Sequence, residues 1–501
     1  MSDSASMRAR GLAALICVLL LAGAWRVFGF VLHEPMWAYG NNYDQVRHTA
    51  CSHVFPHRPG VDPGLYSPDA PLEQFSRQVG VEGPCVWTTE AVFIAGFARV
   101  LAWEEQSGRD GIASVRGVGL IRTTLYIVVL GAATLALWRR NHRAAAAGLA
   151  GAAAVVWADP AMLLWVNTFY AEYASVIALL ACVALLLLAW IDAGTGRRVA
   201  WHGVLGMTAA ALALAFGKVQ FAPMPLALAL GFALAALALP SPLRGRAWWR
   251  IVPFALVALA ALAVQWHLVT RTDDPSIALW RQVGTFNFAF NGVLGSSRDP
   301  TVTAVRIGLP ANCGAYAGRT IFDFQQREQW ERACPQVFAL HRGRVLAKLA
   351  VGEPATLARL AWRAVTALDP WVQRELGHVA NEAYGDVTRE RASFRRVFER
   401  ARALSLGVVL APLAYVLLAL ASRRLRTGTL AVFWLSAWLA NAVIWQQLVL
   451  TAAGDGVHDL SRQAFLVYAA ALGWLVALVA AALARAISPR GPTDVEENLR
   501  V

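Results

Sequence analysis

The sequence predicts an all-α polytopic membrane protein with about ten transmembrane helices and two long loops on its outer face. Of the 501 residues, 57% are hydrophobic and only 15% are charged. The apolar residues occur in continuous runs rather than in the periodic stripes of a soluble core. A run of about 17 to 25 apolar residues crosses a hydrocarbon layer of roughly 30 Å as a helix, which satisfies its own backbone hydrogen bonds.

The runs divide the chain into three parts. The predicted spans are about residues 11–32, 117–138, 144–158, 174–193, 203–217, 221–239, 251–270, 404–421, 429–451 and 464–484. The first has the charge order of a signal peptide, but it is long and no small-residue cleavage site clearly follows, so we expect a retained span. We therefore predict seven spans in 1–270, interrupted by a first outer loop at 33–115, a large outer loop at 271–403, and three spans plus a cytoplasmic tail in 404–501.

Clusters of arginine between the spans predict the orientation. If every run crosses, the amino end and all of the arginine clusters lie on one face, which the positive-inside rule makes cytoplasmic. The net charge of +13 then reflects topology, and we expect no nucleic-acid partner. The same parity places both long loops, the turn after the third span, the turn at Lys218 and residues 454–463 together outside.

The cysteines agree with this topology. Cys51 and Cys85 share the first long loop, whereas Cys313 and Cys334 share the second. Both loops are predicted to face an oxidising compartment, where disulfides persist. These four cysteines are therefore disulfide candidates, although the sequence does not determine how they pair.

Two carboxylates lie close to the point where the first span surfaces. Asp44 stands in the polar stretch Asn41 to His48, and Glu34 is closer still to the span. A carboxylate held near the interface can accept a proton from an attacking hydroxyl group in a partly dry site. We expect Asp44 to be catalytic and Glu34 to bind substrate or anchor the loop.

A second group of polar residues lies between the third and fourth spans. Asp159, Asn167, Tyr170 and Glu172 stand between two apolar runs, where a charge costs free energy and generally faces a cavity or a partner. Lys218 is the only cation in a long apolar stretch; it either snorkels to the surface or neutralises a lipid phosphate. We expect Glu172 to be catalytic and the others to bind substrate.

A third candidate segment precedes the last span. His458, Asp459 and Arg462 lie in the stretch Gly454 to Gln463, and His458 and Arg462 share a face at helical spacing. An arginine fork beside a histidine suits a phosphate or pyrophosphate group. We therefore predict that this segment binds the phosphate of a substrate.

Several common catalytic motifs are missing from the sequence. It contains no glycine-rich phosphate loop, no Gly-x-Ser-x-Gly, no His-Glu-x-x-His and no Cys-x-x-Cys, which argues against nucleotide hydrolysis, serine hydrolysis and a zinc site. The pair Asp273 and Asp274 fits the start of a loop better than a metal site. We expect no cofactor, since no clear motif supports a divalent metal.

The architecture and these motifs resemble the GT-C class of integral membrane glycosyltransferases. In that class a catalytic acid follows the first span, where Tyr43-Asp44-Gln45 stands here, and another acidic residue often follows the third span, as Glu172 does. The stretch from Phe286 to Pro300 is also similar to bacterial glycan-biosynthesis hexosyltransferases, and Arg462 matches an arginine that opens a late span in the class. Gln45 departs from the second acid that is common at that position, and there is no Asp-x-Asp.

The resemblance implies a transferase of the bacterial inner (plasma) membrane with both ends cytoplasmic. It would move a sugar from a polyprenyl-phosphate carrier to an outer-face acceptor, either a lipid-linked glycan or a cell-surface polysaccharide. Asp44 would act as the base, and Arg462, His458 and Lys218 would stabilise the departing phosphate. Its partners would be the lipid bilayer, the polyprenyl-phosphate-linked sugar and the glycan acceptor.

Two other classes of function remain open. A polysaccharide polymerase or ligase acting on lipid-pyrophosphate glycans would make Arg462 central and Asp44 dispensable. A transporter or a non-enzymatic scaffold is the third reading. Transporters place ionisable groups near the middle of their spans and often show internal repeats. Since the spans carry few charges and no repeat is detected, this reading is the least favoured of the three.

Overall fold

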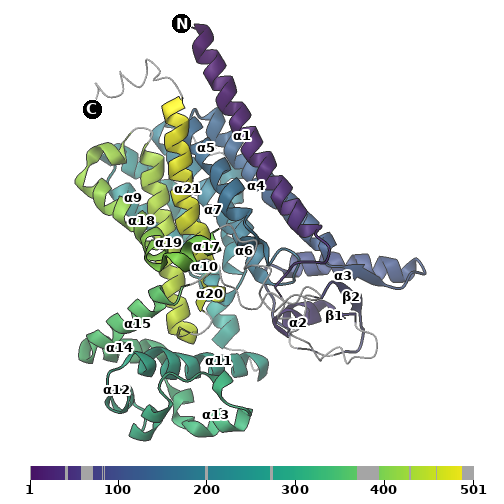
Figure 1. Cartoon of the computed structure of the whole chain (residues 1–501), viewed down its shortest axis with the longest axis vertical. Helices are drawn as coiled ribbons and strands as arrows, with labels where there is room; N and C mark the ends of the chain where they lie inside the picture. The colour runs from purple at the N-terminus through teal and green to yellow at the C-terminus, as the bar shows by residue number, and fades with distance from the viewer. Residues whose placement is uncertain are drawn as a thin grey trace. The chain divides into compact units, whose positions relative to one another are not determined.

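The computed structural model is predominantly helical (Figure 1). It describes residues 2–39, 43–57, 72–81, 83, 85–197, 201–270, 275–368, 394–427, 430–457 and 460–487. Within these residues eight helices are long and apolar enough to cross a membrane, and two shorter apolar helices, Arg143–Trp157 and Trp201–Ala215, match the predicted third and fifth spans. The prediction of an all-α polytopic membrane protein is therefore confirmed.

The chain divides into two compact units. Unit 1 comprises Met1–Gln265, Trp371–Ile444 and Tyr468–Val501, and unit 2 comprises Trp266–Pro370 and Trp445–Val467. The long apolar helices are α1 (Ser2–Val31), α4 (Arg116–Arg139), α7 (Ala171–Gly194), α10 (Ser241–Thr270), α18 (Arg402–Ala421), α19 (Ala431–Asp455) and α21 (Leu466–Ile487). The eighth candidate span, Val219–Leu237, combines the short η3 (Val219–Phe221) with α9 (Met224–Leu237). The shorter apolar helices are α5 (Arg143–Ala152), which continues as the π-helix η2 (Ala153–Trp157), and α8 (Trp201–Ala215).

Small residues allow the helices of unit 1 to pack closely. Figure 1 shows α1, α4, α5 and α7 running side by side, and their contacts agree. A Cβ atom on Gly148 would lie 2.5 Å from the carbonyl oxygen of Ala477, and one on Gly231 would lie 3.0 Å from that of Trp438. Without a hydrophobic driving force between helices in lipid, such close approach supplies the van der Waals contact that holds a bundle together.

The arginine-rich ends of several helices in unit 1 lie together. Leu12 near the start of α1, Leu137 near the end of α4 and Ile191 near the end of α7 share one buried cluster. Arg140 donates to both carboxylate oxygens of Asp192, at 2.8 and 2.9 Å. These contacts agree with the predicted parity, in which the start of α1 and the ends of α4 and α7 share one face.

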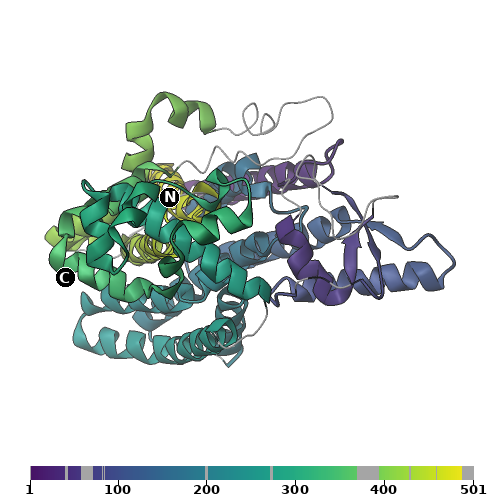
Figure 2. The same cartoon turned by 90° about the horizontal axis from the view of Figure 1, so that it is seen from below.

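The first long loop folds into a small sheet and helices, and this sheet was not predicted. Strands β1 (Val54–Pro56), β2 (Gln74–Arg77) and β3 (Ile112–Ser114) are antiparallel in the order β1-β2-β3. Helices α2 (Tyr43–Thr49) and α3 (Ala91–Gln106) flank the sheet, and Figure 2 shows the strands beside α3. Phe75 of β2, Phe97 of α3 and Phe169 pack edge to face or tilted, which joins the sheet to the turn before α7.

Unit 2 is built from short helices around an aromatic core. They are α11 (Pro275–Asn287), the π-helix η4 (Phe288–Leu294), α12 (Pro300–Ile307), η5 (Ala311–Tyr316), η6 (Ile321–Asp323), α13 (Arg327–Ala333), η7 (Pro335–Ala339), α14 (Arg342–Gly352), α15 (Pro354–Thr366) and α20 (Leu460–Gln463). Phe286 lies against Phe290 and Trp330 at ring-centroid distances of 4.5 and 5.6 Å. This core gives the predicted large loop a compact fold of its own.

Each long loop contains one disulfide. Cys51 is bonded to Cys85 in the first loop, and Cys313 is bonded to Cys334 in the second. These are the pairs that share a loop in the sequence. The two bonds join cysteines that are 34 and 21 residues apart in the sequence. Each bond restricts the conformations that the unfolded chain can adopt.

Candidate functional site

Four segments that are distant in sequence contact one another in unit 1. Asn167 Nδ2 donates to the carbonyl oxygen of Val31 at the end of α1, at 3.2 Å. In the first loop, Thr89 Oγ1 donates to the carbonyl oxygen of Ala213 near the end of α8, at 2.6 Å. Lys218, between α8 and α9, contacts Glu172 at the start of α7. These contacts bring together the helix ends that the topology predicts to be external.

A layer of polar side chains occupies this junction. We call it the polar layer; its members are Gln45, Glu90, Arg122, Asn167, Glu172 and Lys218. All except Lys218 are buried, with exposed fractions of 3% or less. Polar groups buried among apolar helices are costly, and in membrane proteins they generally mark functional positions.

Helix α2, which contains Asp44, is fastened to the polar layer. The side chain of Asp44 lies outside the described part of the structure, but that of its neighbour Gln45 is placed. Gln45 Oε1 accepts a hydrogen bond from the backbone amide of Phe169, at 2.8 Å. On the far side of α2, the amide of Val86 donates to the carbonyl oxygen of Arg47, also at 2.8 Å. The residue next to Asp44 is thus bonded to the turn that precedes α7.

Glu172 and Lys218, both singled out from the sequence, form an ion pair. Lys218 Nζ lies 2.8 Å from Glu172 Oε1, with the carboxylate buried and the ammonium side chain 20% exposed. Glu172 is the second residue of α7, where the helix dipole favours a negative charge. Lys218 therefore binds a carboxylate within the protein and does not only extend to the membrane surface. Because its side chain is partly exposed, an anion can also approach it.

Asp159 has a local structural role. It is fully buried, it caps the short helix α6 (Pro160–Leu163) by accepting from the amide of Ala161 at 3.0 Å, and Arg26 Nη2 of α1 lies 3.9 Å away. An aspartate is among the preferred residues at such a cap. These contacts explain why the sequence holds an acid at this position, independently of substrate.

Two other predicted residues, Asn167 and Tyr170, are packed tightly against their neighbours in unit 1. Asn167 lies so close to Gly119 of α4 that a Cβ there would be 2.2 Å from its Oδ1. Tyr170 contacts Tyr39 and Trp165, with ring centroids 5.2 and 5.1 Å apart.

Glu34 is mostly exposed and lies 3.0 Å from Arg116 Nη2 at the start of α4, so it anchors the first loop.

Glu90 and Arg122 were not predicted as site residues. Both are 0% exposed, and Arg122 Nη2 donates to Glu90 Oε2. Arg122 lies within the candidate span Arg116–Arg139. We expected the spans to carry few charges, and this expectation missed Arg122, the one arginine with a fully buried side chain among the described residues. A charge inside an apolar run was the signal in the sequence that could have identified it.

Burial governs the protonation of Glu90, which lies outside the membrane spans. Loss of solvation raises the pKa of Glu90 to about 7, and the negative charge of Glu172 acts in the same direction. The guanidinium of Arg122 opposes this shift by stabilising the carboxylate. Glu90 can therefore change its charge near neutral pH.

The third candidate segment lies in unit 2. His458 and Asp459 are outside the described residues, and Arg462 lies in α20 but its side chain is not described. The segment is anchored at Asp455, which accepts from Asn287 Nδ2 at 2.7 Å and from Gln463 Nε2 at 2.8 Å. Asn291 Oδ1 accepts from the amide of Val457 at 3.1 Å.

The anchoring asparagines belong to the stretch that resembles hexosyltransferases. Asn287 ends α11, and Asn291 lies in the π-helix η4, a rare conformation that frequently occurs at functional sites. Desolvation lowers the pKa of Arg342, which also belongs to unit 2, while Asp455 opposes that shift. The sequence from Phe286 to Pro300 therefore shapes the backbone that leads to Arg462.

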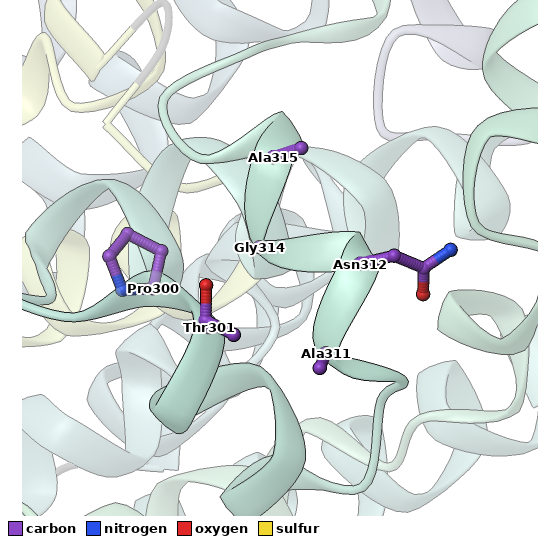
Figure 3. Close-up of a pocket in the computed structure, with 6 residues that line it drawn as sticks. All are labelled: Pro300, Thr301, Ala311, Asn312, Gly314 and Ala315. Carbon is purple, nitrogen blue, oxygen red and sulfur yellow. The ribbon is translucent and has the colours of Figure 1, made fainter.

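A hollow on unit 2 does not have the features of a reaction site. It has a volume of about 380 Å³ and is lined by Pro300, Thr301, Ala311, Asn312, Gly314 and Ala315. Figure 3 shows the Asn312 amide pointing away from Pro300 and Thr301. The residues that line this hollow include no acidic, basic or histidine side chain that could act as a general acid or base.

The described residues contain no group of three or more His, Cys, Asp or Glu side chains that could hold a metal ion. The adjacent acids Asp273 and Asp274, which the sequence made only a weak metal-site candidate, lie outside the described residues.

A known family model covers most of the chain. Residues 78–494, most of the chain, match the family model described as the YfdI N-terminal transmembrane domain. No curated protein and no solved structure matches the chain.

Proposed function

The chain belongs to the YfdI N-terminal transmembrane domain family, and from the GT-C resemblance of its sequence and the polar layer we propose that it is a membrane glycosyltransferase of the GT-C type. In this proposal it takes a sugar from a polyprenyl-phosphate carrier and transfers it to a glycan on the outer face of the bacterial inner membrane. Both chain ends are then cytoplasmic, in line with the positive-inside rule.

One observation carries the proposal: the hydrogen bond from Phe169 to Gln45 fastens the helix of Asp44 to the turn that leads into Glu172. The two acids that the GT-C resemblance selects are far apart in sequence, yet the Gln45 side chain, next to Asp44, binds the backbone of Phe169, three residues before Glu172. This supports a shared site in unit 1. The proposal takes Asp44 as the base because a carboxylate near the membrane interface can accept a proton from an attacking hydroxyl group in a partly dry site.

The proposed reaction is a single displacement at the anomeric carbon. Asp44 accepts the proton of the acceptor hydroxyl group. At the same time the oxygen of that hydroxyl group forms a bond to the anomeric carbon, and the bond from that carbon to the phosphate oxygen breaks. The polyprenyl phosphate leaves with the bonding electrons, and the configuration at the carbon is inverted. Lys218 supplies positive charge that stabilises the phosphate as its charge develops.

Glu172 has a distinct part in this scheme. Its pairing with Lys218 at 2.8 Å keeps the ammonium group at the edge of the layer while the carrier is absent. A carrier phosphate would compete with Glu172 for the same ammonium group. In unit 2, we propose that Arg462 and His458 also bind phosphate, as the sequence predicts.

Deleting the gene and comparing glycans by mass spectrometry tests the proposed function. We expect the deletion strain to lack one sugar residue on a lipid-linked or surface glycan and to accumulate the unmodified acceptor. Re-expression of the wild-type chain is expected to restore that sugar, whereas the Asp44→Asn chain is not.

Other results would favour the alternatives. Accumulation of short repeat units on lipid pyrophosphate would indicate a polymerase or ligase. An unchanged glycan profile would exclude the transferase and leave transport or scaffolding.

A further inference from the structure

The Glu90–Arg122 ion pair has no part in the proposed chemical step, although it lies within the polar layer. Neither side chain is exposed, so neither can touch a sugar or a phosphate in this structure. Burying an ion pair costs desolvation energy that the attraction between the charges often only balances, and apolar residues of similar volume can stabilise a fold equally well. The presence of the pair therefore points to a role in positioning.

Arg122 links two chain segments, the first loop and the turn before α7, through one guanidinium group. Its Nη2 donates to Glu90, which directly precedes α3 in the first loop, and its Nη1 donates to the carbonyl oxygens of Val166, at 2.9 Å, and Thr168. The Arg122 guanidinium also lies over the ring of Phe93, at 5.2 Å. Residues 164–170 have no helix or strand to stabilise them, so these bonds fix their path.

The turn that Arg122 holds supports both halves of the proposed site. Phe169, one residue beyond Thr168, donates to Gln45 beside Asp44. Three residues further on, Glu172 binds Lys218. A displacement of this turn would therefore move α2 and the Glu172–Lys218 pair together.

We propose that Glu90 and Arg122 are a positioning pair for sugar transfer, which holds residues 166–169 so that Asp44 and Glu172 keep their reactive arrangement. This inference rests on the proposed function. Arginine suits the task because its planar fork can donate to a carboxylate and to two carbonyl oxygens at once, whereas lysine offers a single point charge.

A positioning pair of this kind makes transfer sensitive to pH. The charged groups that act on Glu90 are Arg122 from α4 and Glu172 from α7. The pKa of Glu90 is raised to about 7, so the carboxylate becomes protonated as the pH falls through that value. Protonation weakens the charge-assisted bond to Arg122 and loosens the turn. The rate of transfer is then expected to fall on the acid side of about pH 7.

The test is the pH profile of transfer in proteoliposomes, with a radiolabelled polyprenyl-phosphate hexose as donor and membranes of the deletion strain as acceptor. Glu90→Gln is expected to lower kcat by about tenfold or more, to leave KM for the donor within about twofold, and to remove the acid limb centred near pH 7. A side chain that only stabilised the fold would change the yield of active protein and leave the pH profile as it is.

Arg122→Lys provides a second variant that keeps the charge. We expect it to lower kcat because one ammonium group cannot hold Glu90 and both carbonyl oxygens in the same geometry. The matched control is Arg140→Lys, at the opposite end of the same helix, where the carboxylate partner is Asp192. This control is expected to keep kcat within about twofold.

The outcomes separate this inference from the proposed function. If Glu90→Gln and Arg122→Lys both retain the wild-type kcat and pH profile while Asp44→Asn is inactive, the positioning role is wrong and the transferase proposal stands. If Asp44→Asn transfers sugar at the wild-type rate, Asp44 is not the base, and the positioning role, which acts through Asp44, fails with it. If the wild-type protein itself transfers no sugar, the proposed function fails. If Glu90→Gln does not elute as a single folded species, the positioning role is tested by the kcat of Arg122→Lys relative to that of Arg140→Lys.

Discussion

Asp44→Asn is expected to reduce kcat for sugar transfer by about 10²- to 10⁴-fold, because that is the usual contribution of a general base. Asparagine has nearly the same shape as aspartate but cannot accept the proton of the acceptor hydroxyl. Since Gln45 rather than Asp44 makes the bond that fastens α2, the substitution leaves that anchor in place. The measurement is steady-state transfer from a polyprenyl-phosphate hexose by the purified protein in proteoliposomes.

Glu105→Gln is the matched control for this substitution. Glu105 is also a carboxylate of the first loop, but it is exposed and lies 3.4 Å from Arg77 in a surface ion pair. Such pairs contribute about 0 to 1 kcal/mol, so we expect nearly unchanged transfer and stability. An Asp44→Asn protein as active as Glu105→Gln would rule out Asp44 as the base.

Arg122→Met is expected to destabilise unit 1 by about 3 to 5 kcal/mol, because it leaves the buried Glu90 without its charged partner. The double variant Glu90→Leu with Arg122→Met removes both charges and is expected to recover most of this loss. The free energies of unfolding are compared in detergent at pH 8, which is above the pKa of about 7 that Glu90 has beside Arg122 in the wild-type protein.

Arg109→Met serves as the surface control for this comparison. Arg109 lies 2.8 Å from Glu104, but its side chain is 60% exposed. Its removal is expected to cost about 1 kcal/mol or less. Equal destabilisation by Arg122→Met and Arg109→Met would contradict the interpretation of Arg122 as a tightly coupled buried charge. A stable double variant that transfers sugar slowly would separate positioning from stability.

The spans and their relative directions could be predicted because a membrane imposes a simple constraint. Each crossing helix needs a long apolar run, and arginine clusters indicate which ends share a face. The contacts of Asn167 with Val31 and of Lys218 with Glu172 join segments that this parity places on the same face. Sequence reasoning selected Glu172 and Lys218 separately, but it did not predict that they pair.

Other features depend on tertiary contacts that no local pattern reveals. Strand β2 spans only Gln74–Arg77, and it becomes a strand because Phe75 packs between α3 and the turn before α7. Asp159 stays a predicted binding residue, but the sequence did not indicate that it also caps a helix. Glu90 gave no signal at all, because its significance depends on Arg122, which lies 32 residues further along the chain.

We propose that the segment around Asp44 and the segment around Glu172 and Lys218 form one site for a polyprenyl-phosphate sugar. Photo-crosslinking tests it directly, with a donor analogue that carries a diazirine on the sugar and peptide mapping by mass spectrometry. We expect labelling of peptides that contain residues 43–49 and residues 164–173, and we expect unmodified donor to compete for both. Labelling confined to other parts of the chain, or labelling that the unmodified donor does not reduce, would contradict the claim.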